Sequence, residues 1–292
     1  AIDWQPPQIV QVPSSHVARP LWSKLYTPAK METGKRYPVV LFVHGAGYTQ
    51  NTHARFPYYF REQMFHNLLA QQGYIVLDID YRASEGYGRD WRTAIYRQMG
   101  TPELQDLLDG IDWLVETHQA DRERVGVYGG SYGGFMTFMA MFRAPEAFAA
   151  GAALRPVTDW AMYNHEYTAN ILNTPALDPE AYQEYLRGRQ QWHNWSPESF
   201  SRAIEHFERA SPLLRVNADA PPMFVIHGTH DTLVEVSQAR EFVRRLREVS
   251  KNEVAYAELP GTQHAFDVFP SIRSAHVVRG VNRFLRWTYD RA

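Results

Sequence analysis

The sequence predicts an α/β fold built on a mostly parallel, doubly wound sheet. Short, continuous apolar runs recur along the chain, as is typical of strands that are buried on both faces. Amphipathic segments with helical spacing lie between these runs, and such alternation implies right-handed crossovers. The length of 292 residues is sufficient for one large domain with a substantial core.

The first two β-type runs, Gln8–Val12 and Leu21–Tyr26, are expected to pair antiparallel at one edge of the sheet. The later runs that should form the other strands are Val39–Val43, Tyr74–Ile79, Val125–Tyr128, Ala149–Leu154, Met223–Ile226 and Val254–Leu259. The helical patterns between them are Phe60–Gln71, Pro102–Thr117, Phe135–Arg143, Val236–Val249 and Ser274–Trp287. Thr101 offers a capping residue before Pro102 at the first helical position, which predicts where that helix begins.

One segment interrupts the alternation. Residues 155–221 show no strand pattern, are rich in aromatic residues and are too long for a plain loop. We expect them to form a helical cap inserted within a single domain of residues 1–292. Ligands of parallel sheets bind at the carboxyl ends of the strands, so this cap would cover a binding site. The alternative is that the segment only packs on a helix.

Composition excludes several kinds of chemistry and partner. The net charge is −2 and no basic run favours a nucleic-acid partner. The chain has no cysteine, which excludes disulfides, thiolate zinc sites and a cysteine nucleophile. No apolar stretch reaches a membrane-spanning length, and residues 1–13 lack a signal-peptide pattern. These features favour a cytoplasmic location, whereas a homo-oligomer is left open.

A nucleophile motif follows the third strand of the parallel part. Residues Gly129–Gly134 read G-G-S-Y-G-G, between the strand Val125–Tyr128 and the helix Phe135–Arg143. This is G-x-S-x-G in its required context of strand, sharp turn and helix, as in α/β hydrolases. The pattern predicts that Ser131 is a nucleophile projecting above the sheet. The alternative is a tight glycine turn that holds an incidental serine.

A second small-residue motif follows the first strand of the parallel part. It reads His44-Gly45-Ala46-Gly47 and differs by one residue from the H-G-G-G motif that supplies oxyanion donors in this fold. We expect the backbone N–H groups of Ala46, Gly47 and Tyr132 to hold an oxyanion, although the sequence leaves open which residue of the loop donates. The alternative is that the motif only turns the chain.

The acid and the base are expected in chain order after the nucleophile. Asp231 follows the strand Met223–Ile226, and His264 follows the next strand. The competing carboxylates are Asp159, Asp219 and Asp267. His227 and His230 beside Asp231 resemble a metal cluster, but convergent ligands cannot be placed. The sequence therefore predicts a Ser131–His264–Asp231 triad with no metal and no cofactor.

The loop Tyr81–Trp91 resembles the Y-R-G-S-x-G-Y-G loop of the prolyl oligopeptidase family, and residues 129–134 match that family's nucleophile motif. The resemblance is to dipeptidyl peptidase IV-like and acylaminoacyl-peptidase-like catalytic domains, from about residue 37 to residue 178. It implies cleavage of peptides near their amino end, with a β-propeller that gates access and binds that end. The chain contains no propeller, so the resemblance supports acyl-bond chemistry but leaves exopeptidase activity in question.

The same resemblance implies that Trp160, Tyr163 and Tyr167 form the aromatic wall of a proline-accepting substrate pocket. From the residues alone, these aromatic side chains are equally consistent with the core of the cap.

The C-terminal third is more similar to bacterial esterases and lipases of the same fold, in Ser211-Pro212, Ile226–Val234 and Ala257–Phe266. A join of two hydrolase lineages near residues 178–200 is one hypothesis for this change. Together the motifs predict a serine hydrolase that cleaves small carboxylic esters, and peptide or amide bonds as an extension, through an acyl-enzyme. The alternatives are a dipeptidyl or acylaminoacyl peptidase and a non-catalytic binding domain on this fold.

Overall fold

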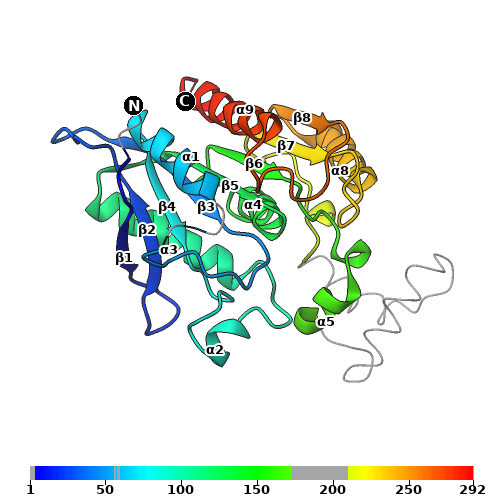
Figure 1. The fold of residues 1–292 in the computed structure, drawn as a ribbon, viewed down its shortest axis with the longest axis horizontal. Helices are drawn as coiled ribbons and strands as arrows, with labels where there is room; N and C mark the ends of the chain where they lie inside the picture. The colour runs from blue at the N-terminus through cyan, green and yellow to red at the C-terminus, as the bar shows by residue number, and fades with distance from the viewer. Residues whose placement is uncertain (1–3, 56, 58–59, 173–209, 292) are drawn as a thin grey trace.

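The computed structural model describes residues 4–55, 57, 60–172 and 210–291 (Figure 1). The helical cap predicted for residues 155–221 is therefore described only at its two ends, and residues 173–209 lie outside the described part. None of the described helices combines the length and the apolar composition that crossing a bilayer would need.

The described strands form one sheet of eight, in the order β1-β2-β4-β3-β5-β6-β7-β8. Their bounds are β1 Gln8–Val12, β2 Leu21–Tyr26, β3 Tyr37–Val43, β4 Ile75–Ile79, β5 Ala120–Gly130, β6 Ala150–Leu154, β7 Met223–Gly228 and β8 Val254–Leu259. β1 and β2 pair antiparallel at the edge, as predicted, and β2 also runs antiparallel to β4. Every other neighbouring pair is parallel, which confirms the predicted sheet.

The described helices are α1 Phe60–Gln71, α2 Arg89–Arg92, α3 Pro102–Thr117, α4 Tyr132–Arg143, α5 His165–Leu172, α8 Val236–Val249 and α9 Ile272–Tyr289. Three short 3-10 turns accompany them: η1 Pro145–Ala147, η2 Trp160–Met162 and η3 Pro212–Leu214. The four-residue α2 was not predicted, because it is too short to show a helical period. Thr101 is the N-cap residue of α3, as predicted, but its side chain makes no capping hydrogen bond. The helix does begin at Pro102, but its start is held by the Glu103 carboxylate, which accepts the Gly100 N–H at 2.9 Å.

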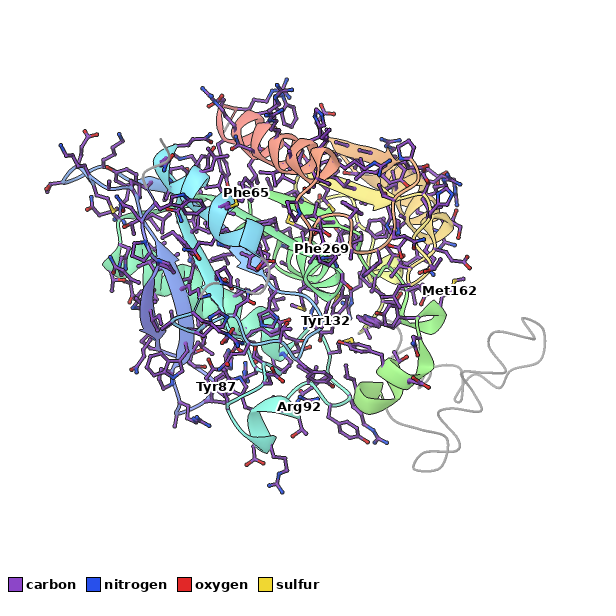
Figure 2. The ribbon with its side chains drawn as sticks, in the orientation of Figure 1. Phe65, Tyr87, Arg92, Tyr132, Met162 and Phe269 are labelled. Atoms are coloured by element: carbon purple, nitrogen blue, oxygen red, sulfur yellow. The ribbon has the colours of Figure 1, made fainter. Side chains whose placement is uncertain are left out.

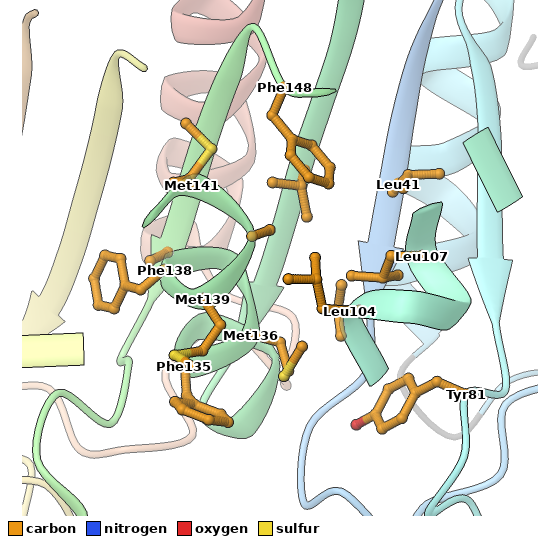
Figure 3. Close-up of a cluster of buried hydrophobic side chains, with 14 of the residues drawn as sticks. Leu41, Tyr81, Leu104, Leu107, Phe135, Met136, Phe138, Met139, Met141 and Phe148 are labelled. Carbon is orange, nitrogen blue, oxygen red and sulfur yellow. The ribbon is translucent and has the colours of Figure 1, made fainter. Parts of the chain in front are cut away.

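Helices cover both faces of the sheet, and alternate residues of each strand face opposite layers. Leu41 of β3 belongs to a buried cluster with side chains of α3, α4 and α8, whereas its neighbours Val40 and Phe42 pack in a second cluster with α1 and α9. Figure 3 shows part of the first cluster, with Leu41, Leu107 of α3 and Met136 of α4 among its labelled side chains. This burial on both faces explains why the strands read as continuous apolar runs.

The parallel strands β3, β5, β6, β7 and β8 all end at one edge of the sheet. The loops that leave them begin at His44, Ser131, Arg155, Thr229 and Pro260. The sheet thus gathers at one edge the residues that the sequence singles out.

Candidate active site

Ser131 lies in a sharp turn between β5 and α4. Its backbone has φ 57° and ψ −114°, a strained conformation for a residue with a side chain. The turn presses against β3: a Cβ atom at Gly129 would lie 2.5 Å from the Val43 carbonyl oxygen, and one at Gly133 only 2.0 Å from it. Glycine is therefore required two residues before and two residues after Ser131. The structure thus supplies the physical reason for the G-x-S-x-G pattern.

His264 connects Ser131 to Asp231. Its Nε2 atom lies 2.9 Å from the Ser131 Oγ atom, and its Nδ1 atom lies 2.7 Å from Oδ2 of Asp231. An ionised carboxylate only accepts hydrogen bonds, so Nδ1 must carry the hydrogen and Nε2 is left to accept from the serine hydroxyl. The structure thus brings together all three residues that the sequence selected, although the nearest two are 33 residues apart.

Asp231 is held as a carboxylate by three close donors and by the more distant His227, whose Nε2 atom also lies 2.8 Å from the Val234 carbonyl oxygen. Its Oδ1 atom accepts the backbone N–H groups of Leu233 at 3.0 Å and Val234 at 2.9 Å. Its Oδ2 atom accepts from His264 and lies 3.3 Å from Nε2 of His227. Burial alone would raise the pKa of Asp231, but the hydrogen bonds from His227, His264 and Val234 outweigh it and hold the pKa well below the usual range.

Burial has the opposite consequence for His264. It disfavours the charged imidazolium and lowers the pKa of His264, and the nearby Arg155 guanidinium acts in the same direction. The hydrogen bond to Asp231 and the charges of Asp231 and Asp267 raise the pKa without restoring its ordinary value. The imidazole is therefore neutral, and able to accept a proton, at neutral pH.

Of the competing carboxylates, Asp219 pairs with Lys251 at 2.8 Å and Asp267 pairs with Arg155, whereas Asp231 is the carboxylate bonded to His264. His230 lies on the exposed loop beside Thr229. Within the described ranges, no group of three or more His, Asp or Glu side chains is arranged to hold a metal ion.

The loop after β3 passes directly beside Ser131. Gly45, Ala46 and Tyr132 line a cavity of about 270 Å³ together with Ser131 and His264. Gly47 is not among the residues that line this cavity, and a side chain there would meet the Tyr167 hydroxyl at 3.0 Å. As the first residue of α4, Tyr132 has a backbone N–H without an acceptor inside the helix. The loop thus brings Ala46 and Tyr132 to the cavity, and Gly47 lies just behind it.

The motif at residues 81–91 holds this loop in place. The Tyr81 hydroxyl donates to the His44 carbonyl oxygen at 3.0 Å, and the Ser84 hydroxyl lies 2.9 Å from Nε2 of the buried His44. Asp80, which precedes the motif, accepts the backbone N–H groups of Asn51 at 2.8 Å and Thr52 at 3.1 Å. These contacts give the Y-R-A-S motif a structural role, because they fix the loop that faces Ser131.

Trp160, Tyr163 and Tyr167 also line the cavity. Trp160 and Tyr167 are stacked with ring centroids 5.9 Å apart, and the Tyr167 hydroxyl donates to the Ala46 carbonyl oxygen at 2.8 Å. Trp160 also packs against Tyr132, which Figure 2 labels near the middle of the molecule. The three rings therefore serve both as a wall of the cavity and as packing for the segment after β6.

The sequence did not reveal three further residues of the site. Arg155 lines the cavity and forms a buried ion pair with Asp267, which was considered only as a rival acid. Glu103 is fully buried and accepts a short hydrogen bond from the Tyr132 hydroxyl, while burial raises the pKa of Glu103 to about 7. The only local signal was the position of Asp267 three residues after His264; the partners are distant in sequence.

The chain matches the model of the prolyl oligopeptidase family over residues 59–290. Dipeptidyl peptidase 8 of Homo sapiens is 34% identical over 183 residues, which are 62% of this chain and 20% of that protein. Esterase LipC of Mycobacterium tuberculosis is 29% identical over 270 residues, 86% of this chain and 58% of LipC. The chain therefore spans between a fifth and about three fifths of the length of these relatives.

Among solved structures, Porphyromonas gingivalis dipeptidyl peptidase 4 has the same fold, with a TM-score of 0.77 at 21% identity over 98% of this chain and 36% of that chain. One family model covers both sides of residues 178–200, so similarity to two groups of hydrolases does not require a join there. The match includes the nucleophile turn, the loops that carry Asp231 and His264, and α9. The chain belongs to the prolyl oligopeptidase family.

Proposed function

We propose that the chain is a serine hydrolase that cleaves small carboxylic esters through an acyl-enzyme on Ser131. The observation that carries this proposal is the pair of hydrogen bonds from His264, to the Ser131 hydroxyl at 2.9 Å and to Asp231 at 2.7 Å. A nucleophile in contact with a base that a third group orients is the arrangement needed for covalent catalysis. Similarity to an esterase and to peptidases agrees with this class.

In the proposed mechanism, Ser131 Oγ attacks the substrate carbonyl while His264 Nε2 takes the hydroxyl proton. The buried carboxylate of Asp231 stabilises the resulting imidazolium. The developing oxyanion accepts hydrogen bonds from the backbone N–H groups of Ala46 and Tyr132, each worth about 3 kcal/mol in the transition state. Gly47 is the third expected donor. His264 then protonates the leaving group, and water, activated by the same imidazole, hydrolyses the acyl-enzyme without a metal or cofactor.

The size and walls of the cavity favour a compact acyl group. Its volume of about 270 Å³ is small, and Trp160, Tyr163 and Tyr167 give it an apolar, aromatic side. We propose that these residues belong to a cap formed by residues 155–221 within a single domain. Support comes from η2, α5 and the residues between them, because Trp160, Tyr163 and Tyr167 of this segment all line the cavity.

Peptidase activity is the second candidate, because dipeptidyl peptidase 8 is among the relatives and the aromatic wall suits a proline ring. We expect p-nitrophenyl acetate and butyrate to be hydrolysed with a higher kcat/KM than Gly-Pro-p-nitroanilide. Initial rates with the three substrates measure this. A higher kcat/KM for the anilide would replace the esterase proposal by the peptidase one. A protein that neither hydrolyses them nor reacts with a fluorophosphonate probe would be a binding domain.

The pH dependence of kcat/KM should report the environment of His264. The imidazole must be neutral to act as a base, so activity should rise with pH through its pKa and level off above it. Burial and Arg155 lower that pKa. The acid limb, which is the pH range over which kcat/KM rises, should therefore have its midpoint below the pKa of about 6.5 typical of an unperturbed histidine. Initial rates of p-nitrophenyl acetate hydrolysis from pH 4 to 8 measure the limb. A midpoint above that of an unperturbed histidine would contradict the assignment.

The expected substrate is a small ester or peptide. A cytoplasmic location and a homo-oligomer stay predictions.

A further inference from the structure

Arg155 occupies the junction between the strands that lead to Ser131 and to Asp231. It follows β6 directly and adopts φ 41°, in the left-handed region that residues with a side chain rarely enter. Its backbone N–H donates to the Ile226 carbonyl oxygen of β7 at 2.7 Å. The preceding carbonyl oxygen, of Leu154, accepts the backbone N–H of Ser131 at 3.0 Å. The backbone at this junction is thus bonded on one side to the nucleophile turn and on the other to β7.

The side chain of Arg155 makes the third connection. Its Nε and Nη2 atoms donate to Oδ1 and Oδ2 of Asp267, a two-point contact that fixes distance and orientation together. Asp267 is fully buried and Arg155 is 7% exposed. Asp267 lies three residues after His264, on the same loop. The ion pair therefore fastens the loop that carries His264.

The pair also lies flat against the nucleophile turn. A Cβ atom at Gly130 would be 3.0 Å from Nη2 of Arg155 and 3.3 Å from Oδ2 of Asp267. Because Gly130 has no side chain, the ion pair can pack directly on the backbone of the residue before Ser131. A shift of the pair would be transmitted both to Ser131 and to the His264 loop.

We propose that Arg155 is a positioning residue, whose ion pair with Asp267 fastens the His264 loop to the Ser131 turn while its backbone holds the strand that leads to Asp231. The proposal rests on the proposed function, because it concerns how the same three residues are aligned. A displacement of about 1 Å in such an arrangement can lower the rate about 10²-fold.

The pair also acts on His264 electrostatically. The charged and titratable groups that face His264 are Asp231 from the loop after β7, Arg155 from the end of β6, Asp267 from its own loop and, near Ser131, Tyr163. Arg155 lowers the pKa of His264, and Asp267 raises it by a smaller amount. In the intact pair the two charges act on the pKa of His264 in opposite directions. Removing one partner exposes His264 to the charge of the other.

The test compares Arg155→Met, Arg155→Lys and Asp267→Asn with the unchanged chain, using p-nitrophenyl acetate. Asp267→Asn should move the acid limb of kcat/KM to lower pH, because the arginine charge is then unopposed. Arg155→Met should move the limb to higher pH and lower kcat about 10²-fold, with a smaller change in KM. Arg155→Lys keeps the charge and loses the two-point contact, so kcat should fall while the limb stays near its original position.

The matched control is the buried pair of Arg82 and Asp106, at 2.9 Å, between the end of β4 and α3. Arg82→Met and Asp106→Asn should lower the melting temperature to a similar extent and leave the acid limb in place. If Arg155→Met does not fold, the test uses instead the double variant Arg155→Met, Asp267→Leu, which removes both charges of the pair. Its limb should lie at higher pH than that of Asp267→Asn, with kcat still low.

Limbs that coincide in the folded variants of Arg155 and Asp267, or that shift in the same direction, would overturn this proposal. Labelling of the unchanged chain by a fluorophosphonate probe separates the two proposals. An unlabelled and inactive chain would overturn the proposed function and this inference with it. A labelled and active chain whose pair variants retain both kcat and the acid limb would overturn the inference alone.

Discussion

Replacement of Ser131 by alanine should lower kcat for p-nitrophenyl butyrate on the order of 10⁶-fold. Ser131 Oγ is the atom that Nε2 of His264 contacts at 2.9 Å, so its removal leaves the base without the hydroxyl that it activates. Alanine has a Cβ atom as serine does, so it must accept the same backbone angles of φ 57° and ψ −114°. The substitution should therefore remove the nucleophile and keep the strained turn.

Initial rates at enzyme concentrations high enough to measure a residual activity test this expectation, together with fluorophosphonate labelling of the same samples. The melting temperature of Ser131→Ala should stay close to that of the unchanged chain. Ser237→Ala is a matched control, because Ser237 is a serine of α8 away from the cavity, hydrogen-bonded to Glu235 at 3.3 Å. It should keep full turnover and labelling. Turnover retained by Ser131→Ala would rule out the acyl-enzyme on this residue.

The sequence predicted those features of the fold that depend on neighbouring residues. The strand before Ser131 and the helix after it each have their own pattern, and the glycines around the serine are required by close contacts with Val43. The convergence of Ser131, Asp231 and His264 was predictable because parallel strands end at the same edge of the sheet. Because the three loops meet at that edge, hydrogen bonds between these side chains could be expected.

Features that depend on distant pairs could not be predicted in this way. Arg155 and Asp267 are 112 residues apart, and neither has a sequence neighbour that marks it as buried. The hydrogen bonds at the start of α3 could not be predicted for a related reason. Thr101 has the right chemistry for a cap, but its hydroxyl accepts from Arg143 of α4 at 2.8 Å, and Glu103 takes over the helix start. In both cases a contact with a residue distant in sequence determines which of several locally possible roles the side chain takes.

Replacement of Asp231 by asparagine should lower kcat about 10⁴-fold, through the tautomer of His264 rather than through its position. The N–H groups of Leu233 and Val234 point at Oδ1, so an amide at this position keeps its oxygen on that side. Its NH₂ group then faces Nδ1 of His264, where Oδ2 now lies at 2.7 Å. A donor in that place requires Nδ1 to accept, which transfers the hydrogen to Nε2 and directs it at Ser131.

The His264 ring would keep its place in Asp231→Asn but could no longer take the serine proton. Measured kcat values for Asp231→Asn and for the control Asp219→Asn, an exposed carboxylate paired with Lys251, test this argument. The control should match the unchanged chain. A loss of less than tenfold in Asp231→Asn would contradict it. The loss should be largest if the two backbone N–H groups fix the amide orientation, because a freely rotating amide could present its oxygen to Nδ1 and restore the productive tautomer. Both oxygens of the carboxylate are therefore expected to act as acceptors. Oδ1 holds the loop through the N–H groups of Leu233 and Val234, and Oδ2 fixes the tautomer of the His264 imidazole.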